Sequence, residues 1–223
     1  MKTLEASQLS TQSLGTLARQ IPGATGVFHR YRLDFCCKGE QHLGVVLQEK
    51  QLDAETILNE LQQLLQRPEA GVNWQGQGAS TLINHILKNY HDVHRIQVPE
   101  LIRLAQRVER VHATHPQCPE GLAEHLMTLL QELESHMLKE EQILFPLLLS
   151  QNTWPNGPIQ VMRMEHTQHG EALEETRRLT QQGQLPEGAC NTWRALYLGL
   201  AALERDLMDH IHLENNILFS GLA

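Results

Sequence analysis

The chain has 223 residues, of which 41% are apolar and 20% charged, and its formal net charge is −8. These values are typical of a globular protein with one or two domains. The acidic balance, without any run of lysine or arginine, gives no reason to expect a nucleic acid or an anionic membrane as partner. Aromatic residues make up only 4% of the chain, whereas Leu, Gln, Glu and Ala are abundant. This composition favours an all-α fold.

The N-terminal part, residues 1–67, is expected to form a small helical domain. Asp53 can cap a helix, because apolar residues follow it at helical spacing. Leu14 and Leu17 indicate another short helix, and a third is expected to begin at Ile21-Pro22. The adjacent residues Cys36 and Cys37 fall in a loop between predicted helices.

A stretch rich in glycine, RPEAGVNWQGQG, follows this domain and shows no apolar period. It predicts a linker over 68–78 and a second domain over 79–223. That domain contains four long helical patterns, at 80–111, 119–149, 158–182 and 189–219, with Pro99 expected to kink the first and Pro146 to bend the second. Because the connections are short, we predict an up-and-down four-helix bundle.

The second and fourth of these helices share one segment. His136 to Phe145 and His210 to Phe219 both read H-x-x-x-E-x-[QN]-I-L-F. The first and third helices match each other through H-x-x-H, which begins at His91 and at His166. The bundle is therefore predicted to be a tandem repeat of a helical hairpin.

The repeated spacing predicts a metal centre. Residues i and i+4 lie on one helix face, about 6 Å apart, so that His136 with Glu140, and His210 with Glu214, can both reach the bundle axis. One further histidine from each remaining helix, His91 and His166, completes a set of imidazoles and carboxylates. Such mixed ligation with spare positions suits iron or manganese, whereas structural zinc favours a closed four-coordinate site.

Two alternatives compete with this interpretation. A single His–Glu pair at this spacing is more often a solvated surface pair, but ionisable residues on a core face are rare unless they are paired or ligate a metal. The apolar residues around the two pairs are arranged alike, which favours the metal interpretation. The other dinuclear pattern, Glu-x-x-His on two helices, fits only Glu109–His112.

The remaining histidines have no ligand frame of this kind. His94 and His169 lie one turn beyond the predicted ligands. Three roles stay open for them: extra ligands, groups that support the ligands, or polar residues at the end of the bundle. The others are expected on the surface or in packing, and they are His29, His42, His112, His115, His125 and His212.

With these motifs in hand, the chain resembles the iron–sulfur cluster repair di-iron proteins, whose bundle is of the hemerythrin type. The resemblance covers nearly the whole chain. It rests on five segments, which are D-x-C-C-x-G at Asp34 to Gly39, Y-H-x-x-H at Tyr90 to His94, S-H-M-x-K-E-E-Q-I-L-F-P at Ser135 to Pro146, E-H at Glu165 and His166, and L-M-D-H-I-x-L-E-N-N-x-L-F at Leu207 to Phe219.

The resemblance implies an oxygen-bridged pair of iron ions. The implied ligands are His91, His136, Glu140, His166, His210 and Glu214. It also implies a role after nitrosative or oxidative damage, with damaged iron–sulfur proteins as clients, and it is compatible with a homodimer. Oxygen-carrying hemerythrins use a fifth histidine, so this four-histidine set leaves more exchangeable positions for nitric oxide or O2.

The cysteines allow several interpretations. Cys118 and Cys190 stand alone and are expected to be structural. Cys36 and Cys37 are poorly placed to form a disulfide with each other. If they are reduced and exposed, they suit metal capture, persulfide chemistry or transient disulfides with partners, so a redox or transfer role is a hypothesis; the alternative is a small buried pair.

Three functions compete. The leading one is repair, in which iron is supplied to damaged clusters or nitric oxide is removed from them. A di-iron nitric oxide reductase that produces nitrous oxide is the runner-up, and a sensor or store for O2 or nitric oxide comes third. Residues 1–10 lack the apolar core of a secretory signal, and the apolar stretch 143–149 is too short to span a bilayer. We therefore expect a cytoplasmic location and reduced cysteines.

Overall fold

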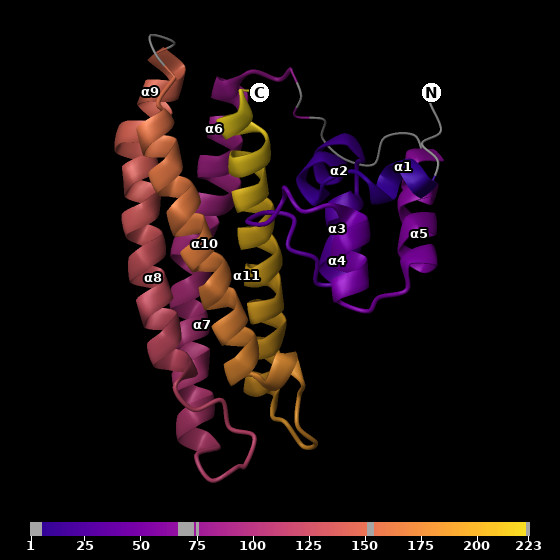
Figure 1. Cartoon of the computed structure of the whole chain (residues 1–223). Coiled ribbons are helices and arrows are strands. Elements are labelled where there is room, and N and C mark those ends of the chain that lie inside the picture. The colour runs from indigo at the N-terminus through magenta and orange to yellow at the C-terminus, as the bar shows by residue number, and fades with distance from the viewer. Residues whose placement is uncertain (1–5, 67–73, 75, 151–153, 222–223) are drawn as a thin grey trace. The chain divides into compact units, whose positions relative to one another are not determined.

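The computed structural model describes residues 6–66, 74, 76–150 and 154–221 (Figure 1). Over these residues the secondary structure is helical, apart from an isolated bridge between Ser13 and His42, which confirms the predicted all-α class. The chain divides into two compact units, Met1–Leu82 with Met208–Ala223, and Ile83–Leu207. Helix α11 (Asn191–Asn216) runs unbroken through both. The predicted boundaries 1–67, 68–78 and 79–223 stay a prediction, and most of the predicted linker lies outside the described residues.

The bundle consists of long helices, two of which are interrupted by a short π-helical segment. In chain order the elements are α6 (Ala79–Ile86), the π-helix η1 (Leu87–His91), α7 (Asp92–Val111), α8 (Leu122–Lys139), the π-helix η2 (Glu140–Leu144), α9 (Phe145–Ser150), α10 (Asn156–Leu179), the 3₁₀ turn η3 (Gln181–Gly183), α11, and the 3₁₀ turn η4 (Leu218–Ser220). Helix α7 continues through Pro99 without a break. No helix in the described part of the chain has the length and apolar composition needed to cross a membrane.

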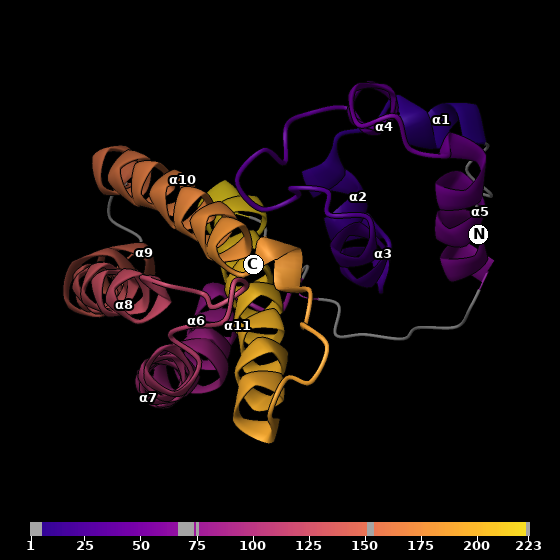
Figure 2. The same cartoon turned by 90° about the horizontal axis from the view of Figure 1, so that it is seen from below.

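Four of these helices pack side by side around a shared core (Figures 1 and 2). Helix α8 packs against both α7 and α10. Arg177 of α10 forms an ion pair with Glu204 of α11. Gly199 of α11 lies so close to α7 that an added Cβ would stand 2.6 Å from Cδ2 of Leu101. The ring α7–α8–α10–α11 is therefore closed, which confirms the predicted four-helix bundle.

The N-terminal part folds into five short helices, two more than the three predicted: α1 precedes the predicted set, and α4 lies within it. They are α1 (Ala6–Ser10), α2 (Leu14–Gln20), α3 (Ala24–Arg30), α4 (Leu43–Glu49) and α5 (Ala54–Gln66). Asp53 caps α5 as predicted, because its Oδ1 accepts from the backbone N–H of Glu55 at 3.1 Å. The third helix was expected to begin at Pro22, but it begins at Ala24. Gly23 has a φ of 88°, and this left-handed turn ends before the helix starts.

The last two turns of α11 belong to the same unit as these short helices. Asn216 is central: its Nδ2 donates to the carbonyl of Phe35 at 3.1 Å, and its own carbonyl accepts from Arg19 at 3.1 Å. The ring of His212 meets the ring of Phe35 edge-on, with centroids 5.4 Å apart. His29 and Asp209 pair at 3.2 Å. Polar and aromatic contacts with α2, α3 and the loop that follows α3 therefore hold this part of α11.

Close approach at Asn216 leads to a stability prediction. A Cβ added to Gly15 in α2 would lie 2.6 Å from Oδ1 of Asn216 and 3.1 Å from the carbonyl oxygen of Gly39. We expect Gly15→Ala to lower the free energy of unfolding by about 1–3 kcal/mol, measured by chemical denaturation. Gly26→Ala is the control, since Gly26 lies inside α3 with nothing within 4 Å of the added Cβ. That variant should gain roughly 0.5–1 kcal/mol. Equal effects of the two substitutions would contradict the packing described here.

Candidate metal centre

The six predicted ligands come from four helical segments, two of which contain a π-helix at the ligand itself. His91 is the last residue of η1, and Glu140 is the first residue of η2. A π-turn inserts an extra residue into the helix and shifts the face on which the following residues lie, and such turns are frequent at functional sites. His166 lies on α10, and both His210 and Glu214 lie on α11.

All six side chains are buried. Glu140 and Glu214 have no exposed surface, and none of the four histidines is more than 1% exposed. An ionised carboxylate without water costs several kcal/mol unless a cation compensates for it. Glu140 lies beside His91 and His136, and Glu214 lies beside His210. Two fully buried carboxylates among histidines fit the donor set of a cation site.

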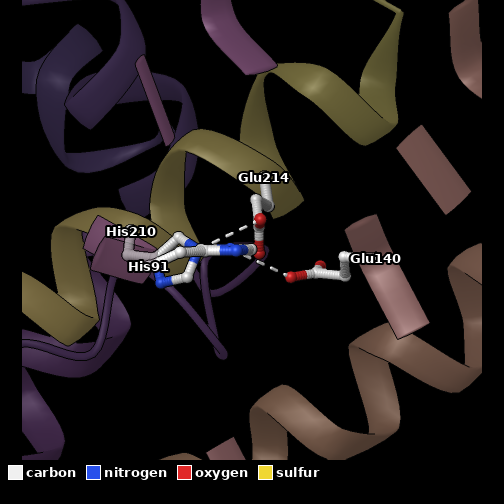
Figure 3. Close-up of side chains that lie close together, drawn as sticks. All are labelled: His91, Glu140, His210 and Glu214. Atoms are coloured by element: carbon white, nitrogen blue, oxygen red, sulfur yellow. Dashed lines mark hydrogen bonds and ion pairs between the residues drawn. The ribbon is translucent and has the colours of Figure 1, made fainter. Parts of the chain in front are cut away.

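The ring nitrogens and carboxylate oxygens point toward one another. Oε2 of Glu140 lies 3.4 Å from Nε2 of His91 and 3.4 Å from Nε2 of His136. Oε1 of Glu214 lies 3.1 Å from Nε2 of His210. Figure 3 shows His91, Glu140, His210 and Glu214 converging, with the contacts His91–Glu140 and His210–Glu214 as dashed lines. Each carboxylate is thus next to the nitrogen that a metal would use.

The arrangement sorts the six residues into two groups of possible ligands. In one group the ligand atoms of His91, Glu140, His210 and Glu214 lie within 4.8 Å of one another, and in the other the same holds for His136, Glu140, His166 and Glu214. Both carboxylates occur in both groups, so each would be within reach of either of two ions. The pairing of His91 with His210, and of His136 with His166, could not be read from the sequence.

One distance bears on whether a metal ion fits. Nε2 of His136 lies 3.0 Å from Nε2 of His166, which is the length of an ordinary hydrogen bond. Two nitrogens that bind one divalent ion at right angles, each about 2.0–2.1 Å from it, are also about 3 Å apart, so the distance is compatible with a shared ion and with a metal-free pair. The donor set of imidazoles and carboxylates fits a hemerythrin-type centre. That these residues are the ligands stays a prediction.

Two further glutamates orient the histidines from outside. Nδ1 of His91 lies 2.8 Å from Oε1 of Glu141, which also pairs with Arg95 at 2.9 Å. In the same way, Nδ1 of His136 lies 2.8 Å from Oε2 of Glu165, which pairs with Lys139. An ionised carboxylate only accepts hydrogen bonds, so it fixes the proton on Nδ1 and leaves Nε2 unprotonated, as a metal ligand must be.

The charge state of these two carboxylates supports this role. The hydrogen bond from His136 lowers the pKa of Glu165 to about 2; burial opposes this effect, and Lys139 adds to it. Partial burial acts to raise the pKa of Glu141, but its bonds to Arg95 and His91 keep the pKa below its ordinary value. Both groups are ionised at neutral pH. Sequence reasoning assigned them no role, and the only signal was their adjacency to Glu140 and His166.

The histidines outside the predicted set take other places. His94 and His169 are buried but belong to neither group of possible ligands in the described part of the chain. His212 is 4% exposed, and burial lowers its pKa to about 4, so it packs as a neutral ring against Phe35. Nε2 of His112 contacts Sγ of Cys190 at 3.1 Å. The packing role expected for His212 agrees with this arrangement.

The cysteine pair lies in the loop between α3 and α4, and all four cysteines are free thiols. Cys36 is 4% exposed, whereas Cys37 is half-buried. Of the two alternatives, exposed thiols or a buried pair, Cys36 follows the second, because its side chain packs inward with the loop. Its hydrogen bond with Cys37, followed by burial, raises the pKa of Cys36 well above its ordinary value. This thiol is protonated at neutral pH and is a weak nucleophile.

Buried imidazoles and carboxylates that converge within a four-helix bundle define the hemerythrin-like class of metal-binding protein. In agreement with this, residues 82–222 match the family model described as "Hemerythrin HHE cation binding domain". Residues 10–65 match a second model, described as "Domain of Unknown function (DUF542)".

Relatives that match nearly the whole chain indicate one family within this class. A protein of Yersinia pseudotuberculosis serotype IB (strain PB1/+), named "Iron-sulfur cluster repair protein YtfE", is 49% identical over 93% of this chain and 95% of its own length. A protein of the same name from Yersinia pestis (strain Pestoides F) has the same identity and coverage. The chain belongs to this hemerythrin-like family of iron–sulfur cluster repair proteins, as the sequence motifs predicted.

Proposed function

We propose that this chain is a di-iron protein that repairs iron–sulfur clusters damaged by oxidative or nitrosative stress. It would do so by delivering iron, by removing nitric oxide, or by both. The observation that carries the proposal is the pair of fully buried glutamates shared by two groups of histidines. The printed names of the Yersinia relatives support the repair role.

The donor chemistry supports iron as the metal. Each group would give one ion two imidazole nitrogens and two shared carboxylates, which are His91 and His210, or His136 and His166, together with Glu140 and Glu214. An octahedral ion takes about six ligands, so the protein would leave some coordination positions of each ion open. Iron held this way supplies redox chemistry and positions open to small ligands. Its exchange with a competing chelator should be faster than in a site that uses a fifth histidine.

The chain's own residues prepare the site before any ion binds. Glu141 and Glu165 hold the Nδ1 protons of His91 and His136, so these two imidazoles present Nε2 without rearrangement. The apolar core around the ligands excludes water. His91, for example, stacks on the ring of Phe145, with the two ring centroids 5.9 Å apart.

The first experiment is the iron content of protein purified without added metal. We expect two irons per chain, most of which are lost in the double variant His136→Ala/His210→Ala, because one imidazole is then missing from each group. His42→Ala, which removes an exposed histidine, is the matched control and should keep its iron. If wild-type protein held zinc or no metal, the di-iron proposal would be refuted.

Repair itself is tested on a client protein whose cluster has been damaged by nitric oxide. Iron-loaded chain should restore the cluster with loss of its own iron in proportion to the clusters repaired, and the double histidine variant should not. Many turnovers of nitric oxide to nitrous oxide with an electron donor, without cluster recovery, would instead identify a nitric oxide reductase.

A further inference from the structure

A second cluster of metal-binding side chains lies in the loop between α3 and α4. A carboxylate oxygen of Asp34 and the sulfur atoms of Cys36 and Cys37 all lie within 4.8 Å of one another. The two sulfurs are 3.5 Å apart, and Sγ of Cys36 lies 3.4 Å from Oδ1 of Asp34. A disulfide needs about 2.05 Å between its sulfurs, so these are two separate thiols that face a common carboxylate.

The loop is built to hold these three groups in place. Oδ1 of Asp34 accepts from the backbone N–H of Cys37 at 2.9 Å, which closes a turn over the cysteine pair. On the other side, Nδ2 of Asn215 in α11 donates to the carbonyl of Cys36 at 3.0 Å. Gly39 completes the loop, because an added Cβ would lie only 2.7 Å from the carbonyl oxygen of Phe35. These backbone contacts hold the carboxylate oxygen of Asp34 and the two sulfur atoms close together.

Two sulfurs and one carboxylate oxygen select a particular kind of cation. Thiolates prefer borderline or soft ions such as Fe²⁺, Co²⁺ and Zn²⁺, whereas Mg²⁺ and Ca²⁺ prefer oxygen alone. Binding would replace the two thiol protons, which leave to solvent, so two protons are released for each divalent ion bound. Cys37 is half-buried, so a fourth ligand can reach the ion from solvent or from another protein.

We propose that Asp34, Cys36 and Cys37 form a mononuclear site for one borderline divalent cation, separate from the centre in the bundle. If the chain has the proposed repair function, on which this assignment rests, the site holds one Fe²⁺ that is on its way to a client protein. Its place in the fold fits that use, since the loop is bonded to Asn215, the residue that follows the predicted ligand Glu214 on α11. The thiolates and the open position match the sulfur-rich environment in which client clusters are held.

The test uses the full-length, iron-loaded protein under anaerobic, reducing conditions and Co²⁺ as the probe. Co²⁺ bound to thiolates gives a charge-transfer absorption in the near ultraviolet. We expect this band to saturate at one added Co²⁺ per chain, with the bundle iron retained. It should be absent in Cys36→Ser/Cys37→Ser and unchanged in the matched control Cys118→Ser/Cys190→Ser.

The carboxylate is tested separately with Asp34→Asn. This change keeps Oδ1 as the acceptor for the backbone N–H of Cys37, and so keeps the turn, but it removes the charge. Affinity for Co²⁺ should fall by at least about tenfold, the loss that removal of a supporting group already causes in metal sites.

Each outcome has one meaning. A wild-type protein without the thiolate band, or a band that survives in Cys36→Ser/Cys37→Ser, would overturn this proposal. Either result leaves the iron content of the bundle untouched, so the proposed repair function could still hold. Iron missing from the bundle in every variant, with the thiolate band present, would instead count against the di-iron function alone.

Discussion

Removing iron from this protein is expected to lower its melting temperature by roughly 8–16 °C. A ligand at about a thousand times its dissociation constant stabilises the folded state by about 4 kcal/mol, and each kcal/mol shifts the melting temperature of a domain of this size by about 2–4 °C. The physical cause is the pair of carboxylates without exposed surface, Glu140 and Glu214, whose charges need a cation. Calorimetry of iron-loaded and chelator-treated protein measures the difference.

A matched variant separates this cause from general damage. In Glu140→Gln/Glu214→Gln the buried charges are gone while the side-chain shapes remain. The metal-free variant should therefore melt at or above the temperature of metal-free wild-type protein, and added iron should no longer raise it. A metal-free variant that melts well below metal-free wild-type protein would show that the two carboxylates stabilise the core without a cation.

The second large effect is expected at Glu165. Glu165→Gln should weaken iron binding by about 10–100-fold, the range measured for groups that orient metal-binding histidines. In wild-type protein Nδ1 of His136 lies 2.8 Å from the Glu165 carboxylate, which only accepts hydrogen bonds. Glutamine carries both an acceptor oxygen and a donor NH2 and has no charge, so it can bond to either tautomer of His136 and no longer fixes the proton on Nδ1. Glu141→Gln should act in the same direction through His91. Competition with a chelator of known affinity measures the loss.

Glu134→Gln is the control for this prediction. Glu134 pairs with Arg95 at 3.0 Å, as Glu141 does at 2.9 Å. Glu134 accepts its hydrogen bonds from Arg95 and not from a predicted ligand. It should leave iron affinity within about twofold, since partly exposed ion pairs contribute less than about 1 kcal/mol. If Glu134→Gln weakened iron binding as much as Glu165→Gln, the effect would come from surface charge and not from the orientation of His136.

Much of the fold was predictable because it depends on local patterns. Apolar residues at helical spacing predicted the long helices to within a few residues: the last was expected at 189–219 and is α11, Asn191–Asn216, followed by a 3₁₀ turn. The short helix α4 was missed, since seven residues carry too little periodicity to stand out. The third helix was placed two residues early, because Pro22 suggested a start that the left-handed turn at Gly23 delays.

The spacing of residues along the chain was enough to predict which side chains converge in the bundle. A spacing of four along one helix puts His136 beside Glu140 whatever the rest of the chain does, and the second copy at His210 and Glu214 repeats this local geometry. How the two copies combine became visible only once the helices were packed: which histidines share a group, that both glutamates occur in both groups, and that Glu141 and Glu165 bond to Nδ1. These relations depend on contacts between helices that are distant in the chain, which local spacing cannot encode. They also depend on π-turns at His91 and Glu140, whose change of helix face leaves no periodic signal in the sequence.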